Sequence, residues 1–134
     1  VLALPGTPPP PAWLPVSGAL LGAGAHFVNV LPDLADDART GVRGLPHRVG
    51  LVGSWAAAGV LLLGSTATLA FGPPGPPSVP GLATLGLALA VLPLGYGLSR
   101  TALARGQRPV AAFRAVLLVA LIDVTLLLVM GWAR

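Results

Sequence analysis

Residues 110–132, VAAFRAVLLVALIDVTLLLVMGW, decide the fold of this protein. The run is apolar apart from a few positions such as Arg114 and Asp123, and as a helix it is long enough to cross a hydrocarbon core of ~30 Å. Backbone polar groups find no water in lipid, and the run lacks the period-2 alternation of a barrel strand. We therefore expect a transmembrane helix here.

Three further apolar runs occur, at about residues 13–31, 49–71 and 81–98. The sequence is 54% hydrophobic and only 9% charged, whereas soluble domains carry roughly 25% charged residues. The net charge of +4 comes from a few arginines between the runs, which argues against a nucleic-acid partner. The sequence predicts an all-α, polytopic membrane helix bundle that forms one domain over residues 1–134.

Small residues are frequent inside these runs, for example Gly18, Gly22, Gly59, Gly95 and Gly97. In lipid, helices associate by close packing, and small side chains let their backbones approach. We expect these positions to face neighbouring helices.

The connections between the runs differ in charge. Residues 72–80 are uncharged and rich in proline, whereas residues 33–48 and 99–109 each carry several arginines. Two spans separate the charged loops, so both lie on one side of the membrane, and the positive-inside rule predicts the cytoplasmic face of the cell (inner) membrane. Trp55 and Tyr96, near span ends, are expected to be interface anchors.

Three of the four acidic residues in the chain, Asp33, Asp36 and Asp37, fall within five positions. Asp33 and Asp37 are four residues apart, so on a helix they share one face. Mg²⁺ uses few protein carboxylates and completes its shell with water or phosphate oxygens. The cluster therefore predicts a Mg²⁺ site for a diphosphate.

Arginines follow this cluster and could bind the same anion with forked donors; they are Arg39, Arg43 and Arg48. A solvated loop with exposed ion pairs, worth ~0 to 1 kcal/mol each, is the alternative for the same residues. The spacing of the charges alone leaves both interpretations open.

The stretch NVLPDLADDARTGVRGLPHRVG, from Asn29 to Gly50, resembles the second aspartate-rich motif of the UbiA superfamily of intramembrane prenyltransferases. The positions that match the motif are Pro32, Asp33, Asp37, Gly41, Val42, Arg43, Arg48, Val49 and Gly50. Other positions depart from it: Val30 and Ala38 replace a usual Asp and Arg, Asn29 replaces a Lys or Asp, and Asp36 replaces Gly. The number of metal ligands is therefore open.

The resemblance implies a bundle of nine helices, of which these four are the last, and Mg²⁺-dependent transfer of an isoprenyl group from a prenyl diphosphate. It gives Asp33 and Asp37 the catalytic role as metal ligands. Asp36 departs from the motif and is a further candidate metal ligand because it lies in the same cluster, and Arg39, Arg43 and Arg48 remain the candidates for diphosphate binding. The acceptor is hydrophobic, small and often aromatic. The first aspartate motif of the superfamily is absent here, so we expect activity only together with an upstream half.

Three polar residues inside the runs are candidates for a cavity lining: His26, Asn29 and Asp123. An ionisable residue within a membrane span suggests function. The alternative for Asp123 is a protonated or hydrogen-bonded carboxyl that joins it to a neighbouring helix. For His26 a hydrogen bond to the helix backbone or to Asn29 is the alternative.

Two other functions fit the sequence. A small transporter would place Asp123 and His26 on an ion path, and a non-catalytic helical scaffold would need neither these residues nor the Asp cluster. The acceptor and the prenyl chain length are not specified by these residues.

Overall fold

The computed structural model describes residues 9–30, 41 and 44–132 of the chain. All regular structure in these residues is helical, as predicted. The helices are α1 (Trp13–Val30), α3 (Leu45–Phe71), α4 (Val79–Ala104) and α5 (Val110–Trp132). Each helix covers one of the four apolar runs.

Three helical segments of the described chain are long and apolar enough to cross a membrane: Arg48–Phe71, Val79–Ala104 and Val110–Met130. This agrees with a membrane protein. The remaining helix, α1, has 18 residues and carries the polar His26 and Asn29 near its end, and it does not meet the same criterion. Three of the four predicted spans are thus supported by length and composition.

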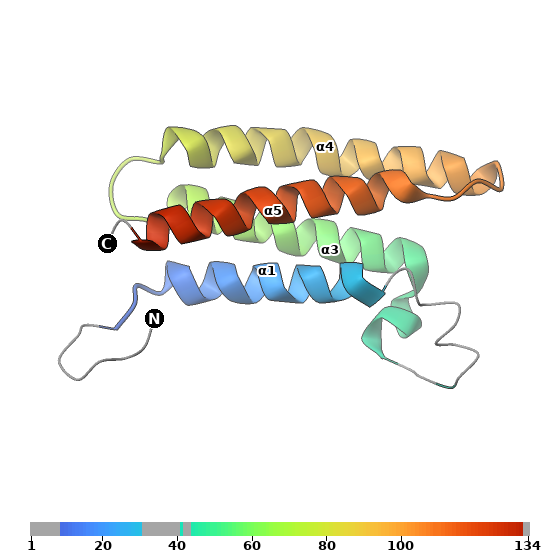
Figure 1. Cartoon of the computed structure of the whole chain (residues 1–134), viewed down its shortest axis with the longest axis horizontal. Helices are drawn as coiled ribbons and strands as arrows, with labels where there is room; N and C mark the ends of the chain where they lie inside the picture. Colours follow the sequence, from blue (N-terminus) through green and yellow to red (C-terminus); the bar gives the residue numbers. More distant parts are fainter. Residues whose placement is uncertain (1–8, 31–40, 42–43, 133–134) are drawn as a thin grey trace.

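The four helices run side by side, and consecutive helices are antiparallel (Figure 1). Helices α3 and α5 form the centre and contact each other as well as both outer helices, α1 and α4. The link between α4 and α5 lies at the same end of the bundle as the last turn of α1 and the first turn of α3 (Figure 1). The proline-rich link between α3 and α4 lies at the opposite end.

Helix α3 contains a break at Gly50, where φ is 70° and ψ is 178°. An L-residue with a Cβ is strained at a positive φ, whereas glycine adopts it readily. The first turn, Leu45–Val49, therefore points in a different direction from the rest of α3 (Figure 1). The predicted span began at residue 49, close to this break, but the turn before it was not predicted.

Helix α4 begins where Ser78 accepts a hydrogen bond from the backbone N–H of Gly81 at 3.2 Å, an N-cap followed by Pro80 in the first turn. It extends to Ala104, six residues beyond the predicted end at residue 98. The extra turns carry Arg100, whose long side chain can reach the interface while its backbone stays helical. The first charged residue after the apolar run therefore does not mark the end of this helix.

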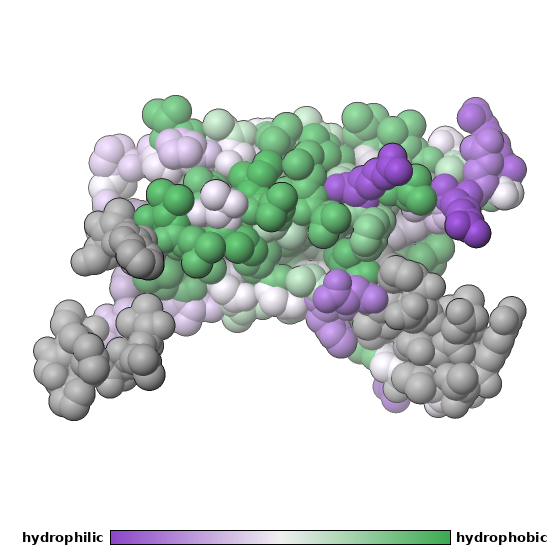
Figure 2. Space-filling view, in the orientation of Figure 1, coloured by the Kyte–Doolittle hydropathy of each residue, from purple (hydrophilic) through white to green (hydrophobic). Residues whose placement is uncertain are grey.

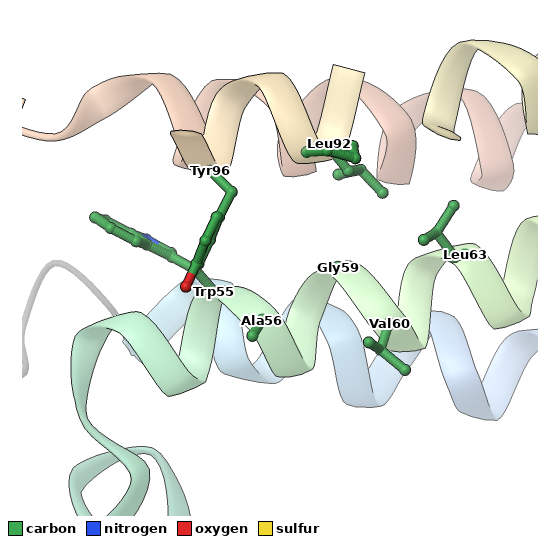
Figure 3. Close-up of a pocket in the computed structure, with 8 residues that line it drawn as sticks. Trp55, Ala56, Gly59, Val60, Leu63, Leu92 and Tyr96 are labelled. Atoms are coloured by element: carbon green, nitrogen blue, oxygen red, sulfur yellow. The ribbon is translucent and has the colours of Figure 1, made fainter. Parts of the chain in front are cut away.

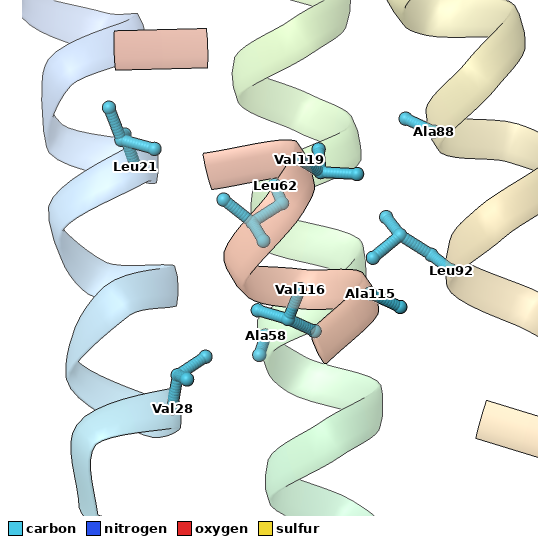
Figure 4. Packing of buried hydrophobic residues seen from close by; sticks show 9 residues of the cluster. All are labelled: Leu21, Val28, Ala58, Leu62, Ala88, Leu92, Ala115, Val116 and Val119. Carbon is cyan, nitrogen blue, oxygen red and sulfur yellow. The ribbon is translucent and has the colours of Figure 1, made fainter. Parts of the chain in front are cut away.

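A buried apolar cluster fills the space between the helices (Figure 4). Leu62 of α3 and Val119 of α5 are completely buried at its centre, and α1 and α4 contribute Leu21, Val28, Ala88 and Leu92. Helix α4 approaches α5 closely at Gly95, because a Cβ there would lie 2.5 Å from the Cβ of Ala115.

The other small residues do not all serve packing. A Cβ built on Gly18, Gly22, Gly59 or Gly97 would meet no atom within 4 Å, apart from neighbouring backbone. These four glycines are thus not packed closely against another helix of the described bundle, whereas Gly95 is. The spacing of small residues alone did not distinguish glycines at a close helix contact from glycines with open space around them.

The surface seen in Figure 2 is apolar along the middle of the bundle and polar mainly at the end that holds the α4–α5 link. Large exposed side chains on the outer faces include Val60, Leu94, Leu121 and Leu128. An apolar belt with polar residues toward one end suits helices that lie in hydrocarbon.

Candidate functional site

One end of the bundle gathers basic side chains, and we call it the arginine end. It is defined by five exposed arginines on α3, α4, α5 and the α4–α5 link: Arg48, Arg100, Arg105, Arg108 and Arg114. Within the described parts of the chain, none of these guanidinium groups forms an ion pair. The arginine end therefore has a concentrated positive charge that favours an anionic ligand.

Most of the predicted metal and diphosphate site lies outside the described residues. This applies to Asp33, Asp36, Asp37, Arg39 and Arg43. Helix α1 ends and α3 begins at the arginine end, so the segment that carries these residues leaves and re-enters the bundle there. Among the residues that the structure does describe, no group of three His, Asp or Glu side chains could hold a metal.

Arg48 is the one predicted diphosphate ligand whose side chain is described. It is exposed in the short turn before the Gly50 break. The break determines the direction of that turn and hence the position of Arg48 at the arginine end.

His26 and Asn29, the predicted cavity residues of α1, are both exposed. The His26 ring lies edge-on to Phe27 with the ring centroids 6.3 Å apart, while the neighbouring Val28 points into the core. Within the described bundle the two polar side chains thus face outward, on the opposite side of α1 from the other helices.

Asp123 is completely buried between α5 and α3. The hydroxyl oxygen of Thr66 on α3 lies 2.9 Å from each carboxyl oxygen of Asp123 and 2.9 Å from the backbone oxygen of Leu62. The hydroxyl has one hydrogen, so it can donate to Leu62 while it accepts from a protonated Asp123 carboxyl. In this arrangement the Thr66 hydroxyl both donates and accepts, and the contact needs no buried charge.

Neighbouring Ser65 extends this contact to the first helix, because its hydroxyl donates to the backbone oxygen of Ser17 on α1 at 3.3 Å. Asp123 itself lies thirteen residues from Val110, which is about 20 Å along α5 at 1.5 Å per residue. Arg114 of the arginine end is nine residues from Asp123, about 14 Å along α5, and Asp123 joins helices, the alternative that the sequence offered for it.

A groove lies between α3 and α4, with a volume of about 200 Å³ (Figure 3). Its lining is almost entirely apolar and comprises Trp55, Ala56, Gly59, Val60, Leu63, Leu92, Pro93 and Tyr96. Trp55 is buried and Tyr96 half-buried, and both pack near Ala112. Trp55 thus lies between helices, and the prediction that it is an interface anchor is wrong.

Arg100 connects this groove to the arginine end. Its Nη1 donates to the hydroxyl of Tyr96 at 3.4 Å, one turn earlier in α4. The sequence analysis did not find the groove, although Gly59 and Leu63, and Leu92 and Tyr96, are each four residues apart and so share a helix face.

Comparison with known proteins gives no match: no family model, no curated protein and no solved structure matches the chain. Its function is therefore inferred from its own residues and their positions.

Proposed function

We propose that this chain is the C-terminal part of an intramembrane prenyltransferase similar to the UbiA superfamily. It transfers an isoprenyl group from a prenyl diphosphate to a small, ring-containing hydrophobic acceptor in the membrane. Support comes from the motif between Asn29 and Gly50 and from helices apolar enough to lie in lipid. The nine-helix bundle and an upstream half with a first aspartate motif belong to the same proposal.

One observation carries the proposal: the Asp-bearing segment leaves α1 and enters α3 at the arginine end. Five exposed guanidinium groups at this end have no ion-pair partner among the described residues. A prenyl diphosphate needs a charged site for its head group beside an apolar region for its chain. The bundle has its positive charge at one end and its apolar surface along its length.

The proposed chemistry divides the work between carboxylates and arginines. Asp33, Asp36 and Asp37 would hold Mg²⁺, which neutralises the charge that develops on the leaving diphosphate. Arg39, Arg43 and Arg48 would donate hydrogen bonds to the diphosphate oxygens and hold the head group in place. The bond between the allylic carbon and the diphosphate oxygen would then break with release of diphosphate. The acceptor would attack that carbon and lose the proton from the atom that forms the new bond.

Gly50 has a part in this proposal because it sets the direction of the turn that carries Arg48. In the motif this glycine follows Arg48 by two residues, and the positive φ gives a physical reason for its presence. Donors that are held in place contribute more to stabilising a transition state than mobile ones.

The test is Mg²⁺-dependent prenyl transfer in membranes that contain the full-length protein. Asp33→Asn and Asp37→Asn should each lower the rate at least about 100-fold, since each removes a carboxylate that would hold the Mg²⁺ at the leaving group. Asp123→Asn is the matched control, because it makes the same chemical change at a buried position of α5 outside the motif and keeps a donor for Thr66.

The rival functions give different results in the same experiment. A transporter would lose its activity in Asp123→Asn and tolerate the changes at Asp33 and Asp37, whereas a scaffold would tolerate all three. A transporter would need His26 and Asp123 on one ion path. In the described bundle His26 is exposed on α1, whereas Asp123 is enclosed between α3 and α5.

A further inference from the structure

The groove between α3 and α4 is suited to a hydrocarbon chain. An apolar cavity of ~150 Å³ is large enough to hold a benzene molecule, and this groove has about 200 Å³. Of the lining residues that Figure 3 labels, Trp55 and Leu92 are buried, while Ala56 and Val60 are exposed. The lining residue Pro93 is exposed as well. Because these exposed residues lie on two helices that are apolar enough to cross a membrane, the groove is accessible from the side of the described bundle.

A positive charge lies next to one end of this groove. Arg100 follows the lining residue Tyr96 by one turn, and its guanidinium donates to the Tyr96 hydroxyl. A cationic group thus stands at the arginine end while the apolar lining continues from Tyr96 to Leu63 toward the middle of the bundle. A ligand that matches this arrangement has an anionic head and a hydrocarbon chain.

The net charge of the head group distinguishes the candidate ligands. Arg100 supplies one positive charge, which balances the single negative charge of a phosphodiester such as phosphatidylglycerol. A diphosphate would need metal ligands as well, and no carboxylate belongs to the groove lining. A zwitterionic lipid would bring a cation that has no acidic partner in that lining.

We propose that the α3–α4 groove binds one anionic phospholipid, with its phosphate at Arg100 and one acyl chain along Trp55, Gly59 and Leu63. This site is separate from the proposed diphosphate site and does not depend on it. It holds a lipid of the host membrane against the two helices that carry Arg48 and Arg100.

The test measures quenching of Trp55 fluorescence by phospholipids with brominated acyl chains. The chain of residues 1–134, with Trp13→Phe and Trp132→Phe so that Trp55 is the only tryptophan, is reconstituted in phosphatidylcholine vesicles. Brominated phosphatidylglycerol should bind about fivefold more tightly than brominated phosphatidylcholine, the preference expected from one arginine near a phosphate. Equal quenching by the two lipids would overturn the proposal.

Two pairs of variants separate the head-group contact from the chain contact. Arg100→Gln should remove the preference for phosphatidylglycerol, whereas Arg114→Gln, the same change on α5 outside the groove, should keep it. Gly59→Leu should prevent quenching by either lipid because the new side chain occupies the groove. Gly86→Leu is its control, since both glycines have open space for a Cβ and only Gly59 lines the groove.

The same assay can exclude the other occupant. Farnesyl diphosphate with Mg²⁺ should leave the quenching by brominated phosphatidylglycerol unchanged. Displacement of the lipid by farnesyl diphosphate would assign the groove to the prenyl substrate and contradict the proposal. Loss of prenyl transfer has no bearing on these measurements, so the two proposals can fail independently.

Discussion

Two ionisable residues of α5, Asp123 and Arg114, have opposite surroundings in this bundle. Asp123 and Arg114 lie on the same helix, yet Asp123 is completely buried and bonded to Thr66 while Arg114 is exposed. A buried polar group is stable when each donor and acceptor has a partner, and Thr66 provides that partner. The sequence shows that Asp123 is unusual within an apolar run. It does not show which residue bonds to Asp123, because Thr66 lies 57 residues away in another helix.

We expect Thr66→Val to destabilise the bundle by about 1–3 kcal/mol, because it removes the hydrogen bond between Thr66 and the buried Asp123 carboxyl. Thr125→Val is the matched control: Thr125 also donates to a carbonyl one turn earlier, at Leu121, but is exposed and has no contact with Asp123. Denaturant unfolding in detergent micelles measures the difference. Equal effects of the two variants would show that the contact with Asp123 contributes nothing to stability.

The positions of the helices along the chain were predicted well, but the side of each helix that packs against its neighbours was not. All four predicted runs correspond to helices, with α1 and α5 ending within one residue of the predicted limits. A helix that lies in lipid is apolar on every side, so hydrophobic periodicity does not reveal which face packs against a neighbour. This is why the sequence did not find the groove and why Trp55 was predicted to lie at an interface with lipid head groups.

The contact between α4 and α5 offers a test at this scale. We expect Gly95→Ala to destabilise the bundle by about 1–3 kcal/mol, because its Cβ would lie 2.5 Å from the Cβ of Ala115 and 3.0 Å from the backbone oxygen of Ala111. Gly97→Ala, two residues further along α4, has open space and should be neutral or stabilising. The close approach of α4 to α5 would be contradicted if both variants had the same unfolding free energy.

For the whole molecule, the antiparallel order of the helices places the arginine end and the proline-rich link at opposite ends (Figure 1). The sequence predicted this from the number of spans between the charged loops. It could not show how α3 and α4 pair to form the groove, because that depends on contacts between residues distant in sequence. The Asp-rich part of the candidate site lies outside the described residues and stays a prediction.

We predict that the arginine end faces the cytoplasm, because Arg and Lys in short loops favour the inner side of the membrane. The chain has no cysteine, so a single introduced thiol reports its own position. In intact cells a membrane-impermeant maleimide should label Pro76→Cys and leave Gln107→Cys unlabelled, and inverted vesicles should give the reverse. Labelling of Gln107→Cys from outside intact cells would contradict the predicted orientation.

The central claim is that the acidic segment at the arginine end binds a prenyl diphosphate through Mg²⁺. Binding of radiolabelled farnesyl diphosphate to the full-length protein in vesicles, with and without Mg²⁺, tests it most directly. We predict binding that requires Mg²⁺ and falls at least about tenfold in Asp33→Asn and in Asp37→Asn, with Asp123→Asn unaffected. Binding that is independent of Mg²⁺, or equal in all three variants, would contradict the account.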